Sequence, residues 1–249
     1  MFERKKFEHR FDGKITPFRI IGNVYFVGCT PASSHLIDTG DGLILIDTGY
    51  EDTLFLLIDS IYKLGFSPMD IKYIIHTHWH GDHTASTKAL CSLTGAKTFI
   101  GKDDNEKVLK YFTPDFLLSD GDTVSLGNTE IHIIETPGHT KGCISFYFDT
   151  VDNGKTYRVG MFGGAGANTL VKDKFDYPDA REGYRNSLNR LRKEKIDVFI
   201  GNHVWNNDTE AKGKLLLETG ENKFIDDKLF YEFLDFCENR LDETIKNDN

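Results

Sequence analysis

Short apolar runs alternate along the chain with longer segments in which apolar side chains recur every three or four residues. Runs at 24–27, 34–37 and 43–46 are bounded by Gly, Pro and Asp, which is typical of strands. Segment 52–64 has helical spacing and is followed by Gly65, a residue that commonly ends helices. The Asp41-Gly42 pair predicts a hairpin turn. The chain therefore begins with strands that turn back on one another, followed by a helix.

The same mixture continues to the end of the chain. Further strands are expected at 73–75, 98–100, 123–126, 130–134, 143–148, 157–162 and 198–200. Further helices are expected at 83–93, 105–111, 180–193, 209–218 and 226–244. Asp152-Asn153-Gly154 predicts a second hairpin turn. Helices and strands alternate while hairpins are also present, so we expect a layered α/β fold with mixed sheets and outer helices.

Composition narrows the class of protein. The chain has 249 residues, of which 39% are hydrophobic and 12% aromatic, enough to fill a core. No Pro- or Ser-rich linker divides it, so we expect one domain over 1–249, with an ordered core at about 15–245 that includes the C-terminal helix. The net charge of −9 argues against a nucleic-acid partner.

The cellular location is predicted from the lack of membrane-spanning and secretory segments and from the spacing of the cysteines. No apolar run approaches the roughly 20 residues that span a bilayer, so no membrane partner is expected. The basic N-terminus has no apolar segment behind it and does not resemble a secretory signal. The cysteines are scattered and form no CxxC pair: Cys29, Cys91, Cys143 and Cys237. These features predict a cytoplasmic protein.

The densest chemistry lies at 74–83, which reads Ile-Ile-His-Thr-His-Trp-His-Gly-Asp-His. Alternate residues that leave a strand point the same way, so His78 and His80 can converge on one ion. Asp82 and His83 then begin a helix and project to a different side. One short segment can therefore serve two adjacent metals. Imidazole and carboxylate suit Zn²⁺, although Fe or Mn are also compatible with these ligands.

This segment resembles the HxHxDH signature of the metallo-β-lactamase superfamily. Three other stretches resemble family motifs in the same order: 45–49, which contains Asp47, 136–140, which contains His139, and 200–203, which ends at His203. The resemblance implies a four-layer αβ/βα sandwich, with two mixed sheets, outer helices and metals at one edge between the sheets.

The resemblance also implies roles for individual residues. His78, His80 and His139 would hold a first Zn²⁺, and Asp82, His83 and His203 a second. Asp47 would orient a ligand, as outer carboxylates commonly do. Asp82 would in addition act in catalysis by orienting the attacking water. His76 precedes the motif and is not expected to be a ligand.

One departure from the family pattern bears on the subclass. Many members carry a metal-bridging Asp where this chain has Gly164. A second metal held by Asp, His and His alone is similar to the third subclass of class B metallo-β-lactamases. Backbone N–H groups near Gly164 and Gly166 could meet an anionic substrate, and so could Lys141. The alternatives are a glycine-rich turn and a solvated lysine.

The resemblance implies a dinuclear zinc hydrolase in which metal-bound hydroxide attacks the carbonyl of a small molecule, with β-lactams as candidate substrates. One alternative is a thioester or lactone hydrolase on the same fold, and another is a metal-binding relative without catalysis. A diiron oxidoreductase is disfavoured because His80 stands where those proteins have Glu.

Segment 102–119, with Tyr111, Phe112 and Phe116, is a candidate substrate wall or ordinary packing. The apolar face of the C-terminal helix either packs on the sandwich or forms a dimer, so the oligomeric state stays open.

Overall fold

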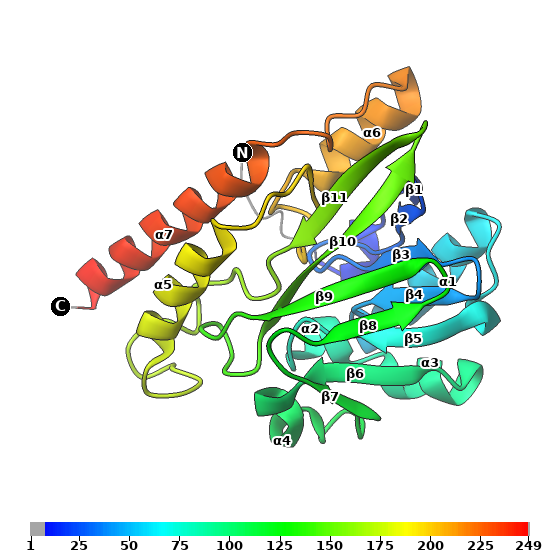
Figure 1. Cartoon of the computed structure of the whole chain (residues 1–249). Coiled ribbons are helices and arrows are strands. Elements are labelled where there is room, and N and C mark those ends of the chain that lie inside the picture. The colour runs from blue at the N-terminus through cyan, green and yellow to red at the C-terminus, as the bar shows by residue number, and fades with distance from the viewer. Residues whose placement is uncertain (1–7, 249) are drawn as a thin grey trace.

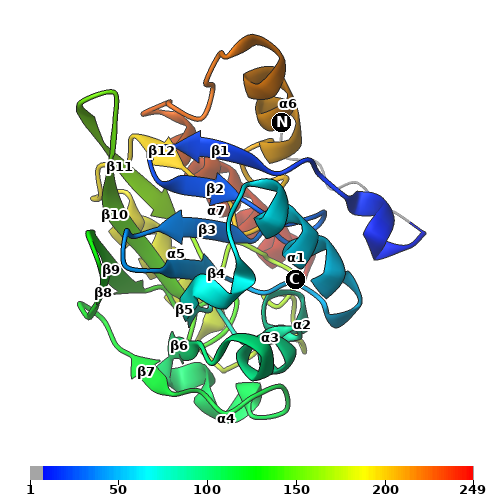
Figure 2. The ribbon, with the colours of Figure 1, turned by 90° about the vertical axis from the view of Figure 1, so that its right-hand side faces the viewer.

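Two β-sheets face each other at the centre of the molecule, and helices cover their outer surfaces (Figures 1 and 2). The computed structural model describes residues 8–248. The first sheet has seven strands in the order β1-β2-β3-β4-β5-β6-β7, and the second has five in the order β12-β11-β10-β9-β8. Both contain parallel and antiparallel pairs. The predicted fold class, two mixed sheets with outer helices, is confirmed.

The strands alternate with helices along the chain, as the hydrophobic pattern predicts. The first sheet contains β1 (Phe18–Ile21), β2 (Val24–Phe26), β3 (His35–Asp38), β4 (Leu43–Ile46), β5 (Ile71–Ile75), β6 (Lys97–Gly101) and β7 (Phe116–Leu118). The second contains β8 (Thr123–Leu126), β9 (Thr129–Glu135), β10 (Ile144–Asp152), β11 (Lys155–Met161) and β12 (Val198–Phe199). The α-helices are α1 (Leu54–Lys63), α2 (Gly81–Thr84), α3 (Thr87–Thr94), α4 (Asn105–Val108), α5 (Ala180–Leu191), α6 (Thr209–Thr219) and α7 (Leu229–Asn247).

Strand β4 shows how the layers are built. All four of its residues are buried. Ile44 and Ile46 belong to the core between the two sheets, whereas Leu43 and Leu45 pack with the buried side chains of α1 and α3 on the outer face. Because side chains alternate across a strand, a run of four apolar residues buries both faces. The strand therefore lies in the middle of the sandwich.

Helices α5 and α7 cover the outer face of the second sheet (Figure 1). The wide apolar stripe of α7 is buried against α5 and β12: Phe230, Phe233, Leu234, Cys237 and Leu241. Side chains of this size contribute about 1.5–3 kcal/mol each when fully buried. The stripe is used for packing within the chain.

Three local predictions need correction. The helix expected at 83–93 is divided into α2 and α3, because the Ser86 hydroxyl donates to the Tyr50 carbonyl at 2.8 Å at the break. The helix expected from residue 52 begins at Leu54, after the 3-10 turn Glu51–Thr53. Strands β1 and β7 were not predicted; β7 is short and exposes two of its three apolar residues.

Both hairpins occur where turn residues predict them. β3 and β4 are antiparallel around the Asp41-Gly42 turn. β10 and β11 are antiparallel, with Asn153 and Gly154 at φ of 49° and 76°. Strands β4, β5 and β6 instead run parallel, so their carboxyl ends meet at one edge of the first sheet. In the described part of the chain no helix is long and apolar enough to cross a membrane.

Candidate metal centre

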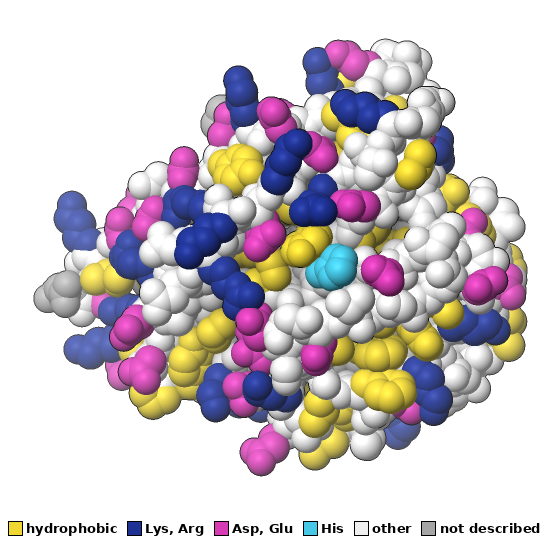
Figure 3. Space-filling view, in the orientation of Figure 1, with side chains coloured by type: hydrophobic (Ala, Val, Ile, Leu, Met, Phe, Trp, Pro, Cys, Tyr) yellow, Lys and Arg dark blue, Asp and Glu magenta, His cyan; other side chains and the backbone are white. Residues whose placement is uncertain are grey.

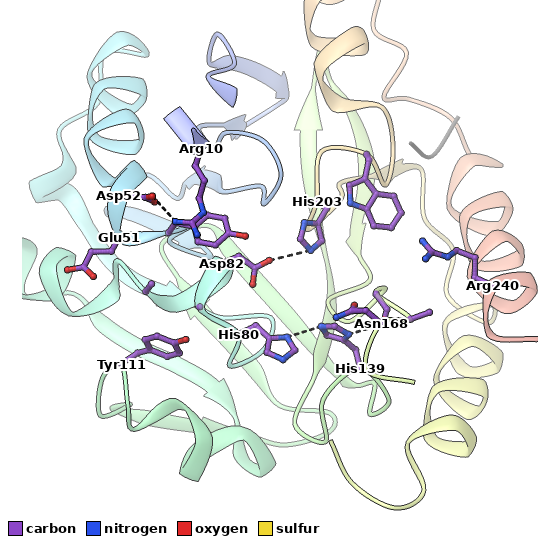
Figure 4. Close-up of a pocket in the computed structure, with 16 residues that line it drawn as sticks. Arg10, Glu51, Asp52, His80, Asp82, Tyr111, His139, Asn168, His203 and Arg240 are labelled. Carbon is purple, nitrogen blue, oxygen red and sulfur yellow. Dashed lines mark hydrogen bonds and ion pairs between the residues drawn. The ribbon is translucent and has the colours of Figure 1, made fainter. Parts of the chain in front are cut away.

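The loop between β5 and α2 carries most of the predicted ligands to the edge between the sheets. His78 and His80 lie in this loop, and His139 comes from the loop between β9 and β10. One ring nitrogen from each of these three residues lies within 4.8 Å of the others. The Nδ1 atom of His80 is 2.9 Å from Nε2 of His139 (Figure 4). Three imidazoles from two loops thus point at one spot.

A second group adjoins the first. Ligand atoms of His78, Asp82 and His83 also lie within 4.8 Å of one another. His203, which follows β12, places Nε2 3.8 Å from Oδ2 of Asp82, and His83 places Nε2 3.6 Å from the same oxygen. Asp82 thus lies between His83 and His203. The structure brings the six predicted ligand residues together, with His78 close to both groups.

Hydrogen bonds on the far side of the rings fix which nitrogen faces the centre. His139 Nδ1 lies 2.7 Å from the Gly166 carbonyl, and His203 Nδ1 lies 3.0 Å from the Pro31 carbonyl. A carbonyl can only accept, so Nδ1 carries the proton in both rings. His83 Nδ1 donates to Asp47 in the same way, at 2.7 Å. In the neutral form of each ring the lone pair is then on Nε2, which faces the ligand cluster and can bind a metal ion there; Nε2 of His139 lies beside Nδ1 of His80.

The donor set passes a direct test for a metal. His83 Nε2 is buried and has no hydrogen-bond partner among the described residues. A buried nitrogen without a partner costs free energy, about 1–3 kcal/mol, unless something occupies its lone pair. The groups next to His83 are the imidazoles of His78 and His203 and the carboxylate of Asp82, which are ligands that bind divalent transition metals. These residues fit a divalent metal.

The charge states favour ligation as well. Burial lowers the pKa of His78 well below its usual range, that of His80 to about 3 and that of His139 to about 4. Burial alone would lower the pKa of His83, but the carboxylates of Asp82 and Asp47 outweigh it and raise that pKa. The carboxylates that favour a proton on Nε2 also favour a metal cation beside it.

Asp82 is ionised in this environment. Burial would raise the pKa of its carboxyl group, but His83, His203 and His80 outweigh burial and lower it to about 2. The neutral imidazoles of His78, His80 and His139 and the ionised carboxylate of Asp82 are in the forms that bind a metal, and a metal at His83 would displace a proton there.

The carboxylate of Asp47 helps to hold two of the predicted ligand residues in position. It follows β4 and has a φ of 56°, a left-handed conformation that Asp adopts more readily than most residues. Its carboxylate is fully buried and accepts from the Thr77 N–H and the Thr77 hydroxyl, each at 2.8 Å, in addition to His83. Thr77 Oγ1 lies 3.1 Å from Nδ1 of His78. One carboxylate thereby links the positions of His78 and His83.

Asp104 holds two of the loops together, a role that the sequence did not reveal. This carboxylate follows β6 and is fully buried. It accepts from the Trp79 N–H at 3.0 Å, the Thr140 hydroxyl at 2.7 Å and the Gly142 N–H at 2.8 Å. Trp79 lies between His78 and His80, and Thr140 is adjacent to His139. Burial raises the pKa of Asp104 to about 6 in spite of these hydrogen bonds.

A cavity of about 980 Å³ opens over the predicted ligands. His80, Asp82, His139 and His203 line it directly (Figure 4). The remaining lining residues come from distant segments: Arg10, Tyr50, Glu51, Asp52, Gly81, Ala85, Tyr111, Gly166, Ala167, Asn168, Trp205 and Arg240. The centre is therefore open to small molecules. The face drawn in Figure 3, in the orientation of Figure 1, carries basic and acidic side chains mixed over the region of α5 and α7.

The residues predicted to bind substrate are distributed unevenly. Gly166 lines the cavity, and its carbonyl also accepts from His139. Gly164 does not line it; a Cβ there would lie 2.5 Å from Sγ of Cys143, so the position has no room for a side chain. Lys141 also lies outside the lining, with its ammonium group 3.5 Å from Asp103.

The candidate wall at 102–119 contributes one residue, Tyr111, whose hydroxyl packs against Gly81. Phe112 instead packs on His76, with ring centroids 4.7 Å apart, and Phe116 is exposed on β7. His76 Nδ1 lies 3.0 Å from the Phe99 carbonyl and Nε2 2.7 Å from Thr87 Oγ1, so both nitrogens face away from the ligand cluster.

Comparison with known proteins agrees with this geometry. Residues 27–203 match the family model of the metallo-β-lactamase superfamily. The chain superposes on FEZ-1, a metallo-β-lactamase from Legionella gormanii, with a TM-score of 0.89 and 32% identity, over 95% of this chain and 97% of that one. It also superposes on BJP-1, a subclass B3 metallo-β-lactamase of Bradyrhizobium japonicum, with a TM-score of 0.88 and 28% identity, over 96% and 97% of the two chains.

A curated relative matches more locally. Over 104 residues the chain is 36% identical to the hydroxyacylglutathione hydrolase of Chelativorans sp. (strain BNC1). The aligned segment covers 42% of this chain and 37% of that protein. The chain spans less than half the length of the curated relatives it matches.

Fold and site together define a β-lactamase-like metallo-hydrolase fold with a histidine-rich site for a divalent metal. The chain belongs to the metallo-β-lactamase superfamily. Its neighbours include subclass B3 enzymes, the subclass that the sequence resembles.

Proposed function

We propose that this protein is a dinuclear zinc hydrolase that cleaves a carbonyl compound of small size. His78, His80 and His139 would hold one ion, and Asp82, His83 and His203 the other. The observation that carries the proposal is the convergence of two ligand groups in one open cavity, with Nε2 of His83, His139 and His203 left for metal by the hydrogen bonds at Nδ1. Bound metal ions would supply a water of lowered pKa and would polarise the substrate carbonyl.

The chain's own residues prepare the site for this chemistry. Asp82 lines the cavity and is ionised, so a carboxylate oxygen can accept a hydrogen bond from the attacking water and orient it. Asp47 and the carbonyls of Gly166 and Pro31 hold the imidazole rings in place. In the net reaction, water adds OH to the acyl carbon, and the leaving group departs with the remaining proton.

Two substrate classes have support. The structural neighbours are named metallo-β-lactamases, which favours a cyclic amide. Several curated relatives are named hydroxyacylglutathione hydrolases, which favours a thioester. Hydrolysis of nitrocefin, an acylglutathione thioester and a simple lactone by zinc-loaded protein separates these classes. We expect turnover of at least one substrate, lost with a chelator and restored by zinc.

His80→Ala tests whether the activity belongs to this site. The variant removes a cavity-lining imidazole, so we expect turnover to fall by at least about 100-fold and bound metal to decrease. His132→Ala, which removes a histidine of β9 that is absent from the cavity lining, is the matched control. Full activity in His80→Ala would overturn the assignment. Absence of turnover on the whole panel by protein with two bound zinc ions would instead favour a non-catalytic metal-binding relative.

We also propose a cytoplasmic location. All four cysteines are free and three are buried, in keeping with a reducing compartment.

A further inference from the structure

Arg240 differs from the other arginines of the described residues in its ion pairing. It projects from α7 and lines the cavity (Figure 4). Among residues 8–248, it has no carboxylate oxygen within the 4.0 Å of an ion pair. The other arginines in that part of the chain each have one: Arg10, Arg19, Arg158, Arg181, Arg185, Arg190 and Arg192. The exception lies in the wall of the candidate active site.

Aromatic side chains connect Arg240 to the metal centre. Its guanidinium carbon lies 5.7 Å from the centroid of the Phe236 ring. Phe236 packs edge-on against Trp205 at 6.4 Å, and Trp205 stacks on His203 at 5.9 Å. A guanidinium over an aromatic face keeps N–H donors at its edge for an anion. Trp205 offers an apolar surface between that charge and a predicted ligand.

Asn168 adds a polar group to the same cavity. A Cβ at position 166 would lie 2.8 Å from Oδ1 of Asn168, so the absence of a side chain at Gly166 gives this amide its place beside His139. Within the described residues the Asn168 amide has no hydrogen-bond partner in the protein, and it lines the cavity next to the predicted ligands (Figure 4). Its NH₂ group can donate to an oxygen of a bound molecule.

On the opposite wall, the basic side chain that the structure describes is already paired. Arg10 is 2.7 Å from Asp52 and stacks on the Tyr50 ring at 4.1 Å. Glu51 also lines that wall and adds negative charge. An anion in the cavity is therefore drawn toward the α7 side, where Arg240 lines the wall.

We propose that Arg240 and Asn168 form a subsite for the carboxylate of an acyl substrate, whose scissile carbonyl lies at the metal centre and whose apolar part lies against Trp205. The substrate class is then a carboxylate-bearing amide, ester or thioester. This inference rests on the proposed hydrolase function. It assigns anion recognition to α7 rather than to Lys141 or Gly164, which lie outside the cavity lining.

The first test measures binding without turnover. Isothermal titration calorimetry on zinc-loaded protein compares 4-phenylbutyrate with the neutral 4-phenylbutyramide. Because a charge-assisted hydrogen bond is worth about 1.5–3 kcal/mol when well formed, and less when exposed, we expect Arg240→Gln to weaken phenylbutyrate binding about 10-fold. Arg240→Lys should keep part of the affinity for phenylbutyrate. Asn168→Ala should lower that affinity about 3-fold, the effect expected for loss of one neutral hydrogen bond. Phenylbutyramide binding should not change.

Arg190→Gln is the matched control, because Arg190 lies on α5, pairs with Asp120 and does not line the cavity. If Arg240→Gln and Arg190→Gln bind phenylbutyrate as the wild type does, or if the wild type does not prefer the acid over the amide, the subsite is wrong.

The second test separates the subsite from the reaction. A thioester with a terminal carboxylate and its methyl ester are compared as substrates. Arg240→Gln should raise KM about 10-fold for the acid only, with kcat nearly unchanged, because the lost contact is uniform binding. If Arg240→Gln hydrolyses the acid with an unchanged KM, the proposed subsite is wrong, whereas the proposed hydrolase function stands. Absence of hydrolysis, with phenylbutyrate binding still dependent on Arg240, overturns the proposed function and leaves the subsite.

Discussion

Both ring nitrogens of His83 face a carboxylate, so the position of this ring depends on several neighbouring residues at once. Nδ1 donates to buried Asp47, while Nε2 faces Asp82. Asp47 also fixes Thr77 by two further hydrogen bonds. Removing one oxygen acceptor therefore disturbs several groups that converge on the same centre.

Asp47→Asn tests this support. The amide offers one acceptor oxygen in place of two, so Thr77 and His83 cannot both be satisfied as they are now. We expect zinc affinity to fall about 10–100-fold, the range typical of groups that orient metal ligands. Competition with a chromophoric chelator measures it. Asp41→Asn, in the exposed hairpin turn of the same sheet, is the control; equal affinity in both variants would contradict the role of Asp47.

His203→Ala tests the division into two ion sites. His203 lies beside Asp82 and, on the proposed assignment, belongs to the second ion only. We expect bound zinc to fall from two ions per chain to one, as measured by mass spectrometry of the metal content after dialysis. An unchanged stoichiometry would show that His203 is not a ligand.

At the scale of elements, parallel strands and one buried carboxylate set the spacing of the loops. The carboxyl ends of β4, β5 and β6 meet at one edge, and Asp104 after β6 ties the His78–His80 loop to the His139 loop. The chain segments that carry the predicted ligands are therefore held together by hydrogen bonds within the protein itself.

Asp104→Asn is expected to loosen this junction. An amide cannot accept from Trp79, Thr140 and Gly142 in the present geometry, and a buried N–H left without a partner costs about 1–3 kcal/mol. Urea unfolding at pH 8 should show a loss of that size. Asp103→Asn, an exposed neighbour, should change stability by less than about 0.5 kcal/mol. Equal stability of the two variants would contradict the role of Asp104.

The sequence predicts elements well where local signals are strong. β4 and β8 have the predicted bounds, and most other predicted strands differ by a few residues at their ends. The ligand motifs could be found because each lies next to a strand end in a short segment. The break between α2 and α3 could not, since it depends on contact with Tyr50. Arg240 and Asn168 carry no local signal, because α7 meets the cavity only in the folded chain.

At the scale of the whole molecule, a buried histidine makes stability depend on pH. His35 on β3 is fully buried, and neither ring nitrogen has a hydrogen-bond partner among the described residues. Burial lowers the pKa of His35 to about 4 from 6.5, although nearby Asp47 opposes the change. The unfolded chain therefore binds the proton first, and stability decreases as pH falls from about 6.5 to about 4.

His35→Leu should remove part of this dependence. The variant cannot take up the proton on unfolding, so we expect the loss of unfolding free energy between pH 7 and pH 4.5 to shrink by about 2–3 kcal/mol. Urea unfolding at several pH values measures this difference in unfolding free energy. Metal is first removed with a chelator, so that metal binding does not contribute to the pH dependence. An unchanged pH slope in His35→Leu would show that His35 is protonated, or solvated, in the folded chain.

The central claim is that two metal ions at this sheet edge carry out hydrolysis. The most direct measurement follows zinc content and turnover of nitrocefin and the thioester together, as metal-free protein is titrated with zinc. The account predicts binding of two ions per chain, with turnover that appears as they bind and disappears on chelation. Zinc binding that saturates below two ions per chain, or turnover that persists in metal-free protein, would contradict it.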